Sequence, residues 1–463
     1  MSLKNRQRRE FLRRSSALGI AGSAAPWAMS LAGIGEAAAA NVTSSAPGDY
    51  KALVCIFLYG GNDCGNTLVP YDQASYNAYA AIRQTLATPR DTLAGTALTP
   101  TVALADGRQM ALAPQFGKLK TVFDAGKLGV LLNVGTLVQP TTLAQYKAGV
   151  RLPPKLFSHN DQQSVWQASS PEGATSGWGG RMGDQFLNAN GNATFTCTNV
   201  SGNAVFMSGQ QAVQYQVSPS GAVAINGVTK PLYGSQACAD ALRSLITAPD
   251  RSHWMEQELN RVVSRSVSAQ SIVSAALGSL APLATAFDST NSLATQLQLV
   301  AKMIAARGSL GVSRQVFFVS LGGFDMHDFL VAQHPGQLTL IDDALASFYQ
   351  ATVALGVADQ VTAFTASDFG RTLTSNGDGS DHGWGSHHFV VGGAVKGGRF
   401  WGTLPSVSVS ADDQVGQGRL LPTSAVDQLA ATLATWMGVS ASDLSRVLPQ
   451  IDNYTQRDLG FFG

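Results

Sequence analysis

Several short runs of apolar residues punctuate the chain, and each ends in glycine or polar residues. The clearest spans 52–59, Ala-Leu-Val-Cys-Ile-Phe-Leu-Tyr, and leads directly into Gly60 and Gly61. A short, continuously apolar run is typical of a strand buried on both faces, as in a parallel sheet. The pattern predicts strands at 52–59, 128–134, 315–321 and 361–366, with a shorter one at 389–391.

Helical periodicity lies between these runs. In 338–355, Ile341, Leu345 and Phe348 recur at the three- to four-residue spacing of a helix that covers a sheet. The pattern predicts helices at 114–125, 338–355, 425–437 and 441–447. Strands that alternate with helices favour the α/β class, with a largely parallel sheet sandwiched by helices.

The middle of the chain follows a different pattern. Residues 192–228 are rich in Thr, Val, Gly, Ser and Asn and alternate in places between apolar and polar, which predicts antiparallel hairpins. Residues 235–307 have mostly helical patterns. We therefore expect 155–310 to form an insertion or cap of mixed β-hairpin and helical structure between two halves of the sheet.

The N-terminus has the order of features found in an export signal. Arg8-Arg9 is followed by Phe11-Leu12, a weakly apolar stretch over 15–35 and a run of alanines at 37–40. This order is that of a signal peptide, and the paired arginines fit the twin-arginine type. An amphipathic arm or a membrane anchor is the alternative, but the stretch is polar for a stable anchor.

These features predict the cellular location of the protein. We expect 1–40 to be a signal peptide that the twin-arginine export machinery recognises. Residues 41–463 are then expected to form one domain that is periplasmic or secreted. No other stretch of the sequence is long and apolar enough to predict a membrane span.

The charge balance bears on the kind of partner. The chain has 31 Lys and Arg against 30 Asp and Glu, and the excess of basic residues lies within 1–40. The remainder carries a net charge of −3, whereas a protein that binds nucleic acid needs a basic face. We expect no nucleic-acid partner.

Polar residues that can do chemistry follow the predicted strands, where ligands bind in open α/β sheets. Asp63 comes after the first strand, although an Asx turn that caps a helix explains it as well. Asp325 and His327 follow the third strand, and a carboxylate with an imidazole is common zinc or iron ligation. A surface turn with an incidental histidine is the alternative.

Further candidates follow the fourth strand. Asp368 is a third carboxylate, and Arg371 could hold an anionic oxygen or form a salt bridge to a neighbouring carboxylate. Four of the seven histidines fall in these strand-exit regions, namely His327, His382, His387 and His388. Such a concentration favours a metal site over chance.

The nucleophile is less clearly marked. Ser158 precedes a predicted helix, and a hydroxyl near a helix N-terminus and a metal is a sound nucleophile. A plain N-cap serine explains it equally well. The sequence has no Gly-x-Ser-x-Gly elbow, no P-loop and no dinucleotide fingerprint with an acidic partner.

Five motifs in this order resemble the exported domain-of-unknown-function 1501 family over nearly the whole of 41–463. They are Gly-Gly-Asn-Asp…Asn-Thr-x-x-Pro (60–70), Ser-His-x-Asp-x-Gln (158–163), Gly-Gly-Phe-Asp-x-His (322–327), Ser-Asp-Phe-Gly-Arg-Thr (367–372) and Asp-His-Gly-Trp…Gly-Gly-x-Val-Lys-Gly-Gly (381–398). That family is similar to the alkaline phosphatase and sulfatase superfamily, so the resemblance implies an alkaline phosphatase-like fold.

The resemblance also implies roles for individual residues. The implied metal ligands are Asp63, Asp325, His327, Asp368 and His382, with His387 as a substitute for His382. The superfamily has a histidine after the later aspartate, where this chain has Phe369. Ser158 would be the nucleophile and Arg371 would stabilise developing charge. His159 or His388 would be the general acid.

The function expected from this reading is an exported hydrolase of phosphate or sulfate esters. It would depend on one or two divalent metal ions, with zinc, iron, manganese and calcium not distinguished. Its substrate would be an anionic ester or glycan. Phe369 motivates the alternative, a non-hydrolytic envelope or polysaccharide-associated binding protein on a degenerate hydrolase fold.

Overall fold

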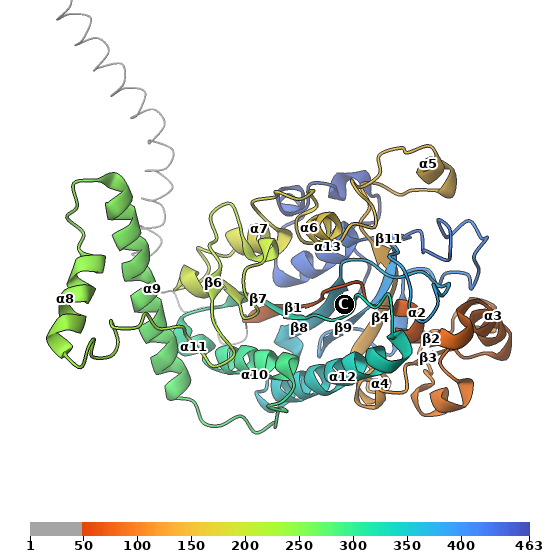
Figure 1. The fold of residues 1–463 in the computed structure, drawn as a ribbon, viewed down its shortest axis with the longest axis horizontal. Coiled ribbons are helices and arrows are strands. Elements are labelled where there is room, and N and C mark those ends of the chain that lie inside the picture. The colour runs from red at the N-terminus through yellow and green to blue at the C-terminus, as the bar shows by residue number, and fades with distance from the viewer. Residues whose placement is uncertain (1–48) are drawn as a thin grey trace, which may run out of the picture.

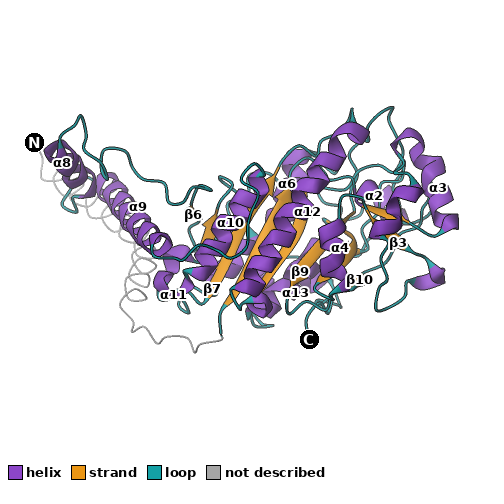
Figure 2. Ribbon diagram, turned by 90° about the horizontal axis from the view of Figure 1, so that it is seen from below, coloured by secondary structure: helices purple, strands orange, loops and turns teal. Residues whose placement is uncertain are grey.

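The computed structural model describes residues 49–463, so the expected signal peptide at 1–40 lies outside the described residues. Within 49–463 the main sheet has nine strands with helices on both faces (Figure 1, Figure 2). They are β1 (Lys51–Leu58), β4 (Leu128–Gly135), β5 (Cys197–Asn199), β6 (Tyr215–Gln216), β7 (Arg314–Leu321), β8 (Val361–Ser367), β9 (Ser386–Gly392), β10 (Arg399–Trp401) and β11 (Ser424–Ala425). The predicted α/β class with a largely parallel sheet is confirmed.

The direction of one strand matters for the site. The strand order is β10-β4-β9-β8-β1-β7-β5-β6, with β11 also paired to β4. β1 runs parallel to β7 and β8, whereas β9 runs antiparallel to β8 and β4. The beginning of β9 therefore lies at the same edge of the sheet as the carboxyl ends of β1, β7 and β8.

The central strand β1 shows why its sequence is continuously apolar. Its even-numbered side chains pack into the core under α4 (Gly117–Asp124), α10 (Ser292–Ala305) and α12 (Leu330–Ala354). The odd-numbered side chains 53, 55 and 57 pack against the opposite layer, which contains α6 (His159–Ala168), α7 (Trp178–Asp184) and α13 (Val426–Met437). Both faces of 52–58 are buried, so only the first position of β1, the half-buried Lys51, has a polar side chain.

Several further elements are short. They are α2 (Cys64–Thr67), β2 (Leu68–Pro70), α3 (Gln73–Arg83), β3 (Met110–Leu112), α5 (Leu143–Lys147), α11 (Arg307–Leu310) and α14 (Leu444–Val447). β2 and β3 form a separate antiparallel pair. Within the described part of the chain, no helix has the length and apolar character needed to cross a membrane.

The five predicted strands and four predicted helices are all present, although most have different bounds. Two of them begin at least three residues before the predicted start. α12 begins at Leu330 rather than at 338 and contains Pro335. β9 begins at Ser386 rather than at 389. The earlier start of β9 places His387 and His388 inside the sheet rather than in the loop before it.

The middle of the chain differs more from the prediction. The strands within 192–228 pair in parallel, because β5 adds to the edge of β7 and β6 adds to β5. The backbone N–H and C=O groups of β5 therefore bond to the edge of the main sheet, whereas in a hairpin they would bond to the neighbouring strand of the same segment. Antiparallel contact in 192–228 is limited to an isolated bridge between Ser218 and Gly221.

The region 155–310 is divided between the body and a projection. α6, α7, β5 and α10 belong to the layers around the main sheet. In contrast, α8 (Gln236–Thr247) and the first half of α9 (Trp254–Gly278) project away from the body (Figure 1, Figure 2). We call this projection the α8–α9 arm.

A buried ion pair anchors the loop that follows β1. Asp63 accepts from the Asn66 backbone N–H at 3.1 Å as the N-cap of α2. Its other oxygen contacts Arg83 at 2.6 Å and Ser380 Oγ at 3.1 Å. Burial pushes the pKa of Asp63 upward, but Arg83 outweighs burial and lowers the pKa overall. The pair therefore ties α3 and the loop before β9 to the end of β1.

We expect Asp63→Asn to destabilise the fold strongly. The Arg83 side chain is 0% exposed, so the substitution leaves a buried charge without a counter-ion. Loss of one partner of such a pair costs about 3–5 kcal/mol, measurable by denaturant unfolding. The matched control Asp343→Asn breaks a surface pair with Lys118 and should cost less than about 1 kcal/mol. Equal effects of the two variants would contradict this assignment.

Candidate metal centre

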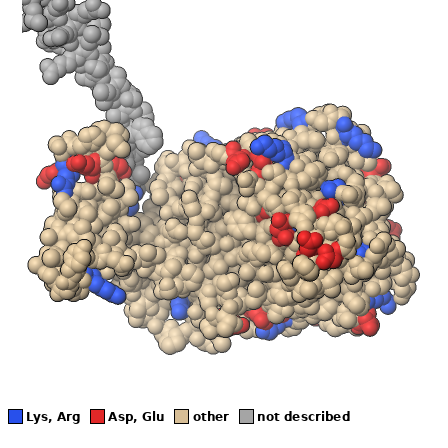
Figure 3. Space-filling view, viewed as in Figure 1, with Lys and Arg blue, Asp and Glu red and all other residues tan. Residues whose placement is uncertain are grey.

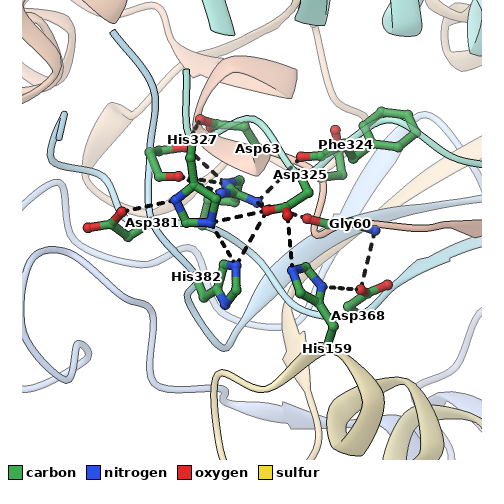
Figure 4. Close-up of polar contacts among 12 residues, drawn as sticks. Gly60, Asp63, His159, Phe324, Asp325, His327, Asp368, Asp381 and His382 are labelled. Carbon is green, nitrogen blue, oxygen red and sulfur yellow. Dashed lines mark hydrogen bonds and ion pairs between the residues drawn. The ribbon is translucent and has the colours of Figure 1, made fainter. Parts of the chain in front are cut away.

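The site lies at the edge of the sheet where four strand ends meet (Figure 4). Asp325 follows β7, and Asp368 directly follows β8. His382 precedes β9 and reaches the same edge because β9 runs antiparallel. His159 is the first residue of α6, and its imidazole completes the group.

Close backbone packing brings these loops together. Gly60 has a φ of +116°, and a Cβ atom there would lie 2.3 Å from the Asp325 backbone nitrogen. Its N–H donates to Asp368 at 3.2 Å. Any side chain at position 60 would push apart the loops that carry Asp325 and Asp368.

Asp325 is the centre of the cluster. Its Oδ1 lies 3.2 Å from His327 Nε2 and 3.4 Å from His382 Nε2. Its Oδ2 lies 3.4 Å from His159 Nε2. One ligand atom each from His159, Asp325 and His382 lies within 4.8 Å of the others. The two nitrogens His327 Nε2 and His382 Nε2 are 2.9 Å apart.

Each imidazole is held through its other nitrogen, Nδ1. The acceptors are Asp368 for His159 at 2.6 Å, the Phe157 carbonyl oxygen for His382 at 2.7 Å, and Asp381 for His327 at 3.2 Å. A carboxylate or carbonyl oxygen only accepts, so each Nδ1 carries the hydrogen. In the neutral ring, Nε2 then presents a lone pair. This arrangement is the usual one for histidines that bind metal.

The result is a convergence of acceptor atoms that repel one another unless a cation or a proton lies among them. His159 Nε2 is buried and has no hydrogen-bond partner. Four of the separations, at 2.9–3.4 Å, are close to the roughly 3.3 Å expected between tetrahedral ligands about 2.0–2.1 Å from a shared ion, while the set of His159, Asp325 and His382 spans up to 4.8 Å. Imidazoles with one carboxylate are a donor set that fits a divalent transition metal.

The charge states of two of the three candidate ligands also suit a cation. Burial pushes the pKa of Asp325 upward, but the hydrogen bond and charge of Arg371, together with the nearby His159 and His327, lower the pKa overall. Burial lowers the pKa of His382. The hydrogen bond to Asp368 raises the pKa of His159, against the effect of burial. Asp325 is therefore ionised and His382 neutral near pH 7, as metal ligands must be.

Asp368, a predicted ligand, lies behind His159. Its Oδ2 accepts from His159 at 2.6 Å, from Gln163 at 2.8 Å and from the Gly60 N–H. His159 and Gln163 are four residues apart on α6 and share one face of that helix. The structure thus gives Asp368 the place of a residue that orients His159.

Arg371 forms the salt bridge that was the alternative to anion binding. Its Nη1 donates to the Gly60 carbonyl oxygen at 2.8 Å and to Asp325 Oδ1 at 3.0 Å. Nε and Nη2 donate to the Ser380 carbonyl oxygen at 3.0 and 2.5 Å. The side chain is 1% exposed. These contacts favour the salt-bridge alternative for Arg371, because Nε, Nη1 and Nη2 all donate within the protein.

The hydroxyl of Ser158, the predicted nucleophile, is hydrogen-bonded outside the cluster. The Ser158 hydroxyl donates to Asp161 at 2.9 Å, and Ser158 is the N-cap residue of α6. The residues on either side of Ser158 contribute to the cluster instead. His159 enters the cluster, and Phe157 adopts a left-handed backbone with a φ of 72° that presents its carbonyl oxygen to His382.

Two other predicted ligands are not in the cluster. Asp63 is held by Arg83, as described above. His387 lies inside β9, where its Nδ1 accepts from the Asn133 backbone N–H at 3.0 Å and burial lowers its pKa to about 4. His388, a predicted general acid, is buried against Trp166, and burial lowers its pKa to about 3. Both histidines lie below the edge because β9 begins before them.

Phe369, which stands where the superfamily has a histidine, packs its ring against two imidazoles of the cluster. Its ring centroid lies 4.9 Å from that of His159 and 4.7 Å from that of His382. Two contributors had no assigned role in the sequence analysis, Gln163 and Asp381. The four-residue spacing of Gln163 from His159 was the available signal for the first. The contact of Asp381 with His327 joins distant loops, and the sequence held no signal for it.

The side chains of the cluster that reach solvent include carboxylates, and the guanidiniums beside it are engaged within the protein. Asp325 is exposed and Asp381 is half-buried, whereas Arg371 is buried against Asp325 and Arg419 donates to the His382 carbonyl oxygen. Without a further cation these carboxylates would repel an anionic ligand.

Comparisons with known proteins identify a family but no activity. The family model described as "Protein of unknown function (DUF1501)" matches residues 50–446. A comparison with curated proteins found no match.

Solved structures overlap the chain only weakly. A Bacteroides thetaiotaomicron protein from work on glycosaminoglycan metabolism is 11% identical, with a TM-score of 0.35 over 85% of this chain and 73% of its own. The PsFucS1 sulfatase from Pseudoalteromonas sp. is 10% identical, with a TM-score of 0.35 over 89% and 70%. The lipoteichoic acid synthase LtaP from Listeria monocytogenes is 8% identical, with a TM-score of 0.32 over 90% and 81%. At these scores the overlaps carry no argument about this chain.

We expect Arg371→Lys to destabilise the protein. Lysine keeps the charge but lacks the planar fork that reaches the carbonyl oxygens of Gly60 and Ser380 together. Buried acceptors left without donors should cost about 2–4 kcal/mol in denaturant unfolding. The control Arg446→Lys, whose side chain is 77% exposed, should cost less than about 0.5 kcal/mol. A fully stable Arg371→Lys protein would refute the bracing role.

Proposed function

The chain belongs to the DUF1501 family, and we propose that it is a metal-dependent hydrolase of phosphate or sulfate esters. One observation carries the proposal. Three imidazoles, each fixed through Nδ1, turn Nε2 toward Asp325, and His159 Nε2 is buried without a hydrogen-bond partner, 3.4 Å from Asp325 Oδ2. Such an arrangement is unfavourable for a purely structural cluster and favourable for one that holds a cation.

His159, Asp325 and His382 would hold the ion, with His327 as a fourth ligand. When bound, a divalent cation supplies positive charge that polarises an ester oxygen and lowers the pKa of a water nucleophile. The described residues include one group of possible ligands of this kind, His159, Asp325 and His382, so we propose one ion per chain.

The chain's own groups support hydrolysis by water. The Ser158 hydroxyl makes its hydrogen bond with Asp161 and not with a member of the cluster. We propose that water forms the new bond to phosphorus or sulfur while the bond to the ester oxygen breaks. The water gives up a proton, and the ester oxygen takes up a proton and leaves as an alcohol. The Asp325 side chain is 46% exposed, so an ester has direct access to the cluster.

A second candidate function follows from the hydrogen bonds that Ser158 and Arg371 make within the protein. A site without a free hydroxyl or a free cation suits a protein that binds an envelope component or polysaccharide through a bound ion without cleaving it. The same fold and the same cluster would serve both functions, so metal content alone does not separate them. Turnover does.

The test measures metal and turnover on the same samples. The purified protein, reconstituted with Zn²⁺ or Mn²⁺, should hold about one ion per chain, as determined by elemental analysis. It should hydrolyse p-nitrophenyl phosphate or p-nitrophenyl sulfate. Asp325→Asn and His382→Gln should each weaken metal binding by more than about 100-fold, since even orienting partners are worth 10–100-fold.

The control is His253→Gln, which removes an exposed histidine on the α8–α9 arm and should change neither property. No bound metal in the wild-type protein would refute the cation site itself. Bound metal without turnover on any ester would refute the hydrolase and leave the binding function.

We also propose that the protein is exported by the twin-arginine route and works in the periplasm or outside the cell. The proposal rests on the sequence of 1–40, which lies outside the described residues. Replacing Arg8-Arg9 by Lys-Lys should retain the full chain in the cytoplasm, as seen by cell fractionation. The matched change at Arg13-Arg14 should leave export intact. Equal export of both variants would exclude this route.

A further inference from the structure

The α8–α9 arm leaves large apolar side chains exposed. Figure 3 shows a mostly uncharged surface on the arm, with acidic and basic side chains close together near one end. The exposed fractions are 58% for Leu245, 71% for Trp254, 59% for Met255, 61% for Leu259 and 48% for Val262. Scattered apolar residues are ordinary on a surface, but several on one projecting element indicate an interaction site.

The apolar side chains of α9 are regularly spaced. Met255, Leu259 and Val262 follow one another at intervals of four and three residues, the spacing of a coiled-coil seam. The buried residues of the same segment, Asn260 and Val267, lie on a different side of the helix. The seam therefore faces outward, away from the contacts that α9 makes with its own chain.

The second half of α9 gives the seam a firm base. Ala269, Val273 and Ala276 belong to the hydrophobic core of the main body. The first half extends from that base as a continuous helix together with α8 (Figure 2). Because one end of α9 is packed in the core, the orientation of the exposed seam relative to the body is fixed, as a recognition surface requires.

The charges beside the seam indicate which partner fits. Glu258 and Arg265 are seven residues apart, so they share one flank of the seam, and both are exposed. When two identical helices pair antiparallel, this flank of one helix meets the same flank of the other. Glu258 then faces the partner's Arg265, and Arg265 faces the partner's Glu258.

The arm as a whole also carries no net charge. Its basic residues within 236–278 are Arg243, Arg251, Arg261 and Arg265, and its acidic residues are Asp240, Asp250, Glu256 and Glu258. Two arms therefore do not repel each other. An anionic bilayer, by contrast, attracts surfaces with an excess of basic charge, which this arm lacks.

We propose that the α8–α9 arm is a dimerisation element that pairs with the arm of a second copy of this chain. The two α9 helices lie antiparallel about a two-fold axis between residues 260 and 261, with Leu259 against the partner's Val262. Such an interface is self-complementary and closed, so assembly ends at a dimer. The proposal does not depend on the metal centre.

Sedimentation of the full chain tests the proposal. The wild-type protein should have the mass of a dimer, and Leu259→Asp should weaken the dimer by at least about 100-fold. The control Val353→Asp introduces the same charge at a side chain of α12 that is 52% exposed, and should leave the dimer intact. Circular dichroism checks that each variant is folded.

A charge exchange tests the antiparallel arrangement. Glu258→Arg and Arg265→Glu should each weaken the dimer by about tenfold or more, because like charges then meet. Combining them should restore it, while Arg261, which contacts Glu258 within its own helix, stays unchanged. A double variant as weak as either single one would refute the antiparallel pairing.

Two results would overturn the proposal as a whole. One is a wild-type protein that stays monomeric at high micromolar concentration. The other is a monomer that binds neutral phosphatidylcholine vesicles and loses that binding in Leu259→Asp, which would assign the arm to a membrane surface. Ester hydrolysis should be the same in Leu259→Asp and wild type, so failure here is separable from failure at the metal centre.

Discussion

A single buried guanidinium connects the loops that form the candidate metal centre. Arg371 follows β8, and it donates to Gly60 after β1, to Asp325 after β7 and to Ser380 before β9. These loops are distant in sequence, and their polar backbone groups would otherwise be buried without partners. The positions of Asp325 and the histidines around it depend on this one side chain.

The cluster shows a division between groups that orient and groups that face the centre. The Nδ1 atoms are fixed by Asp368, Asp381 and the Phe157 carbonyl oxygen, while the Nε2 atoms face Asp325. Bringing these acceptors together costs free energy unless a cation or a proton lies among them. The buried Asp63–Arg83 pair, which lies outside the cluster, ties down one of the same loops and helps to keep the arrangement closed.

The arm and the metal centre are separate parts of the molecule. The centre depends on strand ends and buried polar contacts, whereas the arm depends on a helix that leaves the core after one half of its length.

The sequence by itself determined the α/β class, the main strands and the edge of the sheet at which the candidate ligands lie. These features follow from local burial, which the spacing of apolar residues reports directly. Only the tertiary structure decided which polar residues meet. The antiparallel direction of β9 brought His382 to the edge and left His387 inside the sheet. Asp63 and Arg371 found buried partners from distant loops, and such contacts leave no periodic trace along the chain.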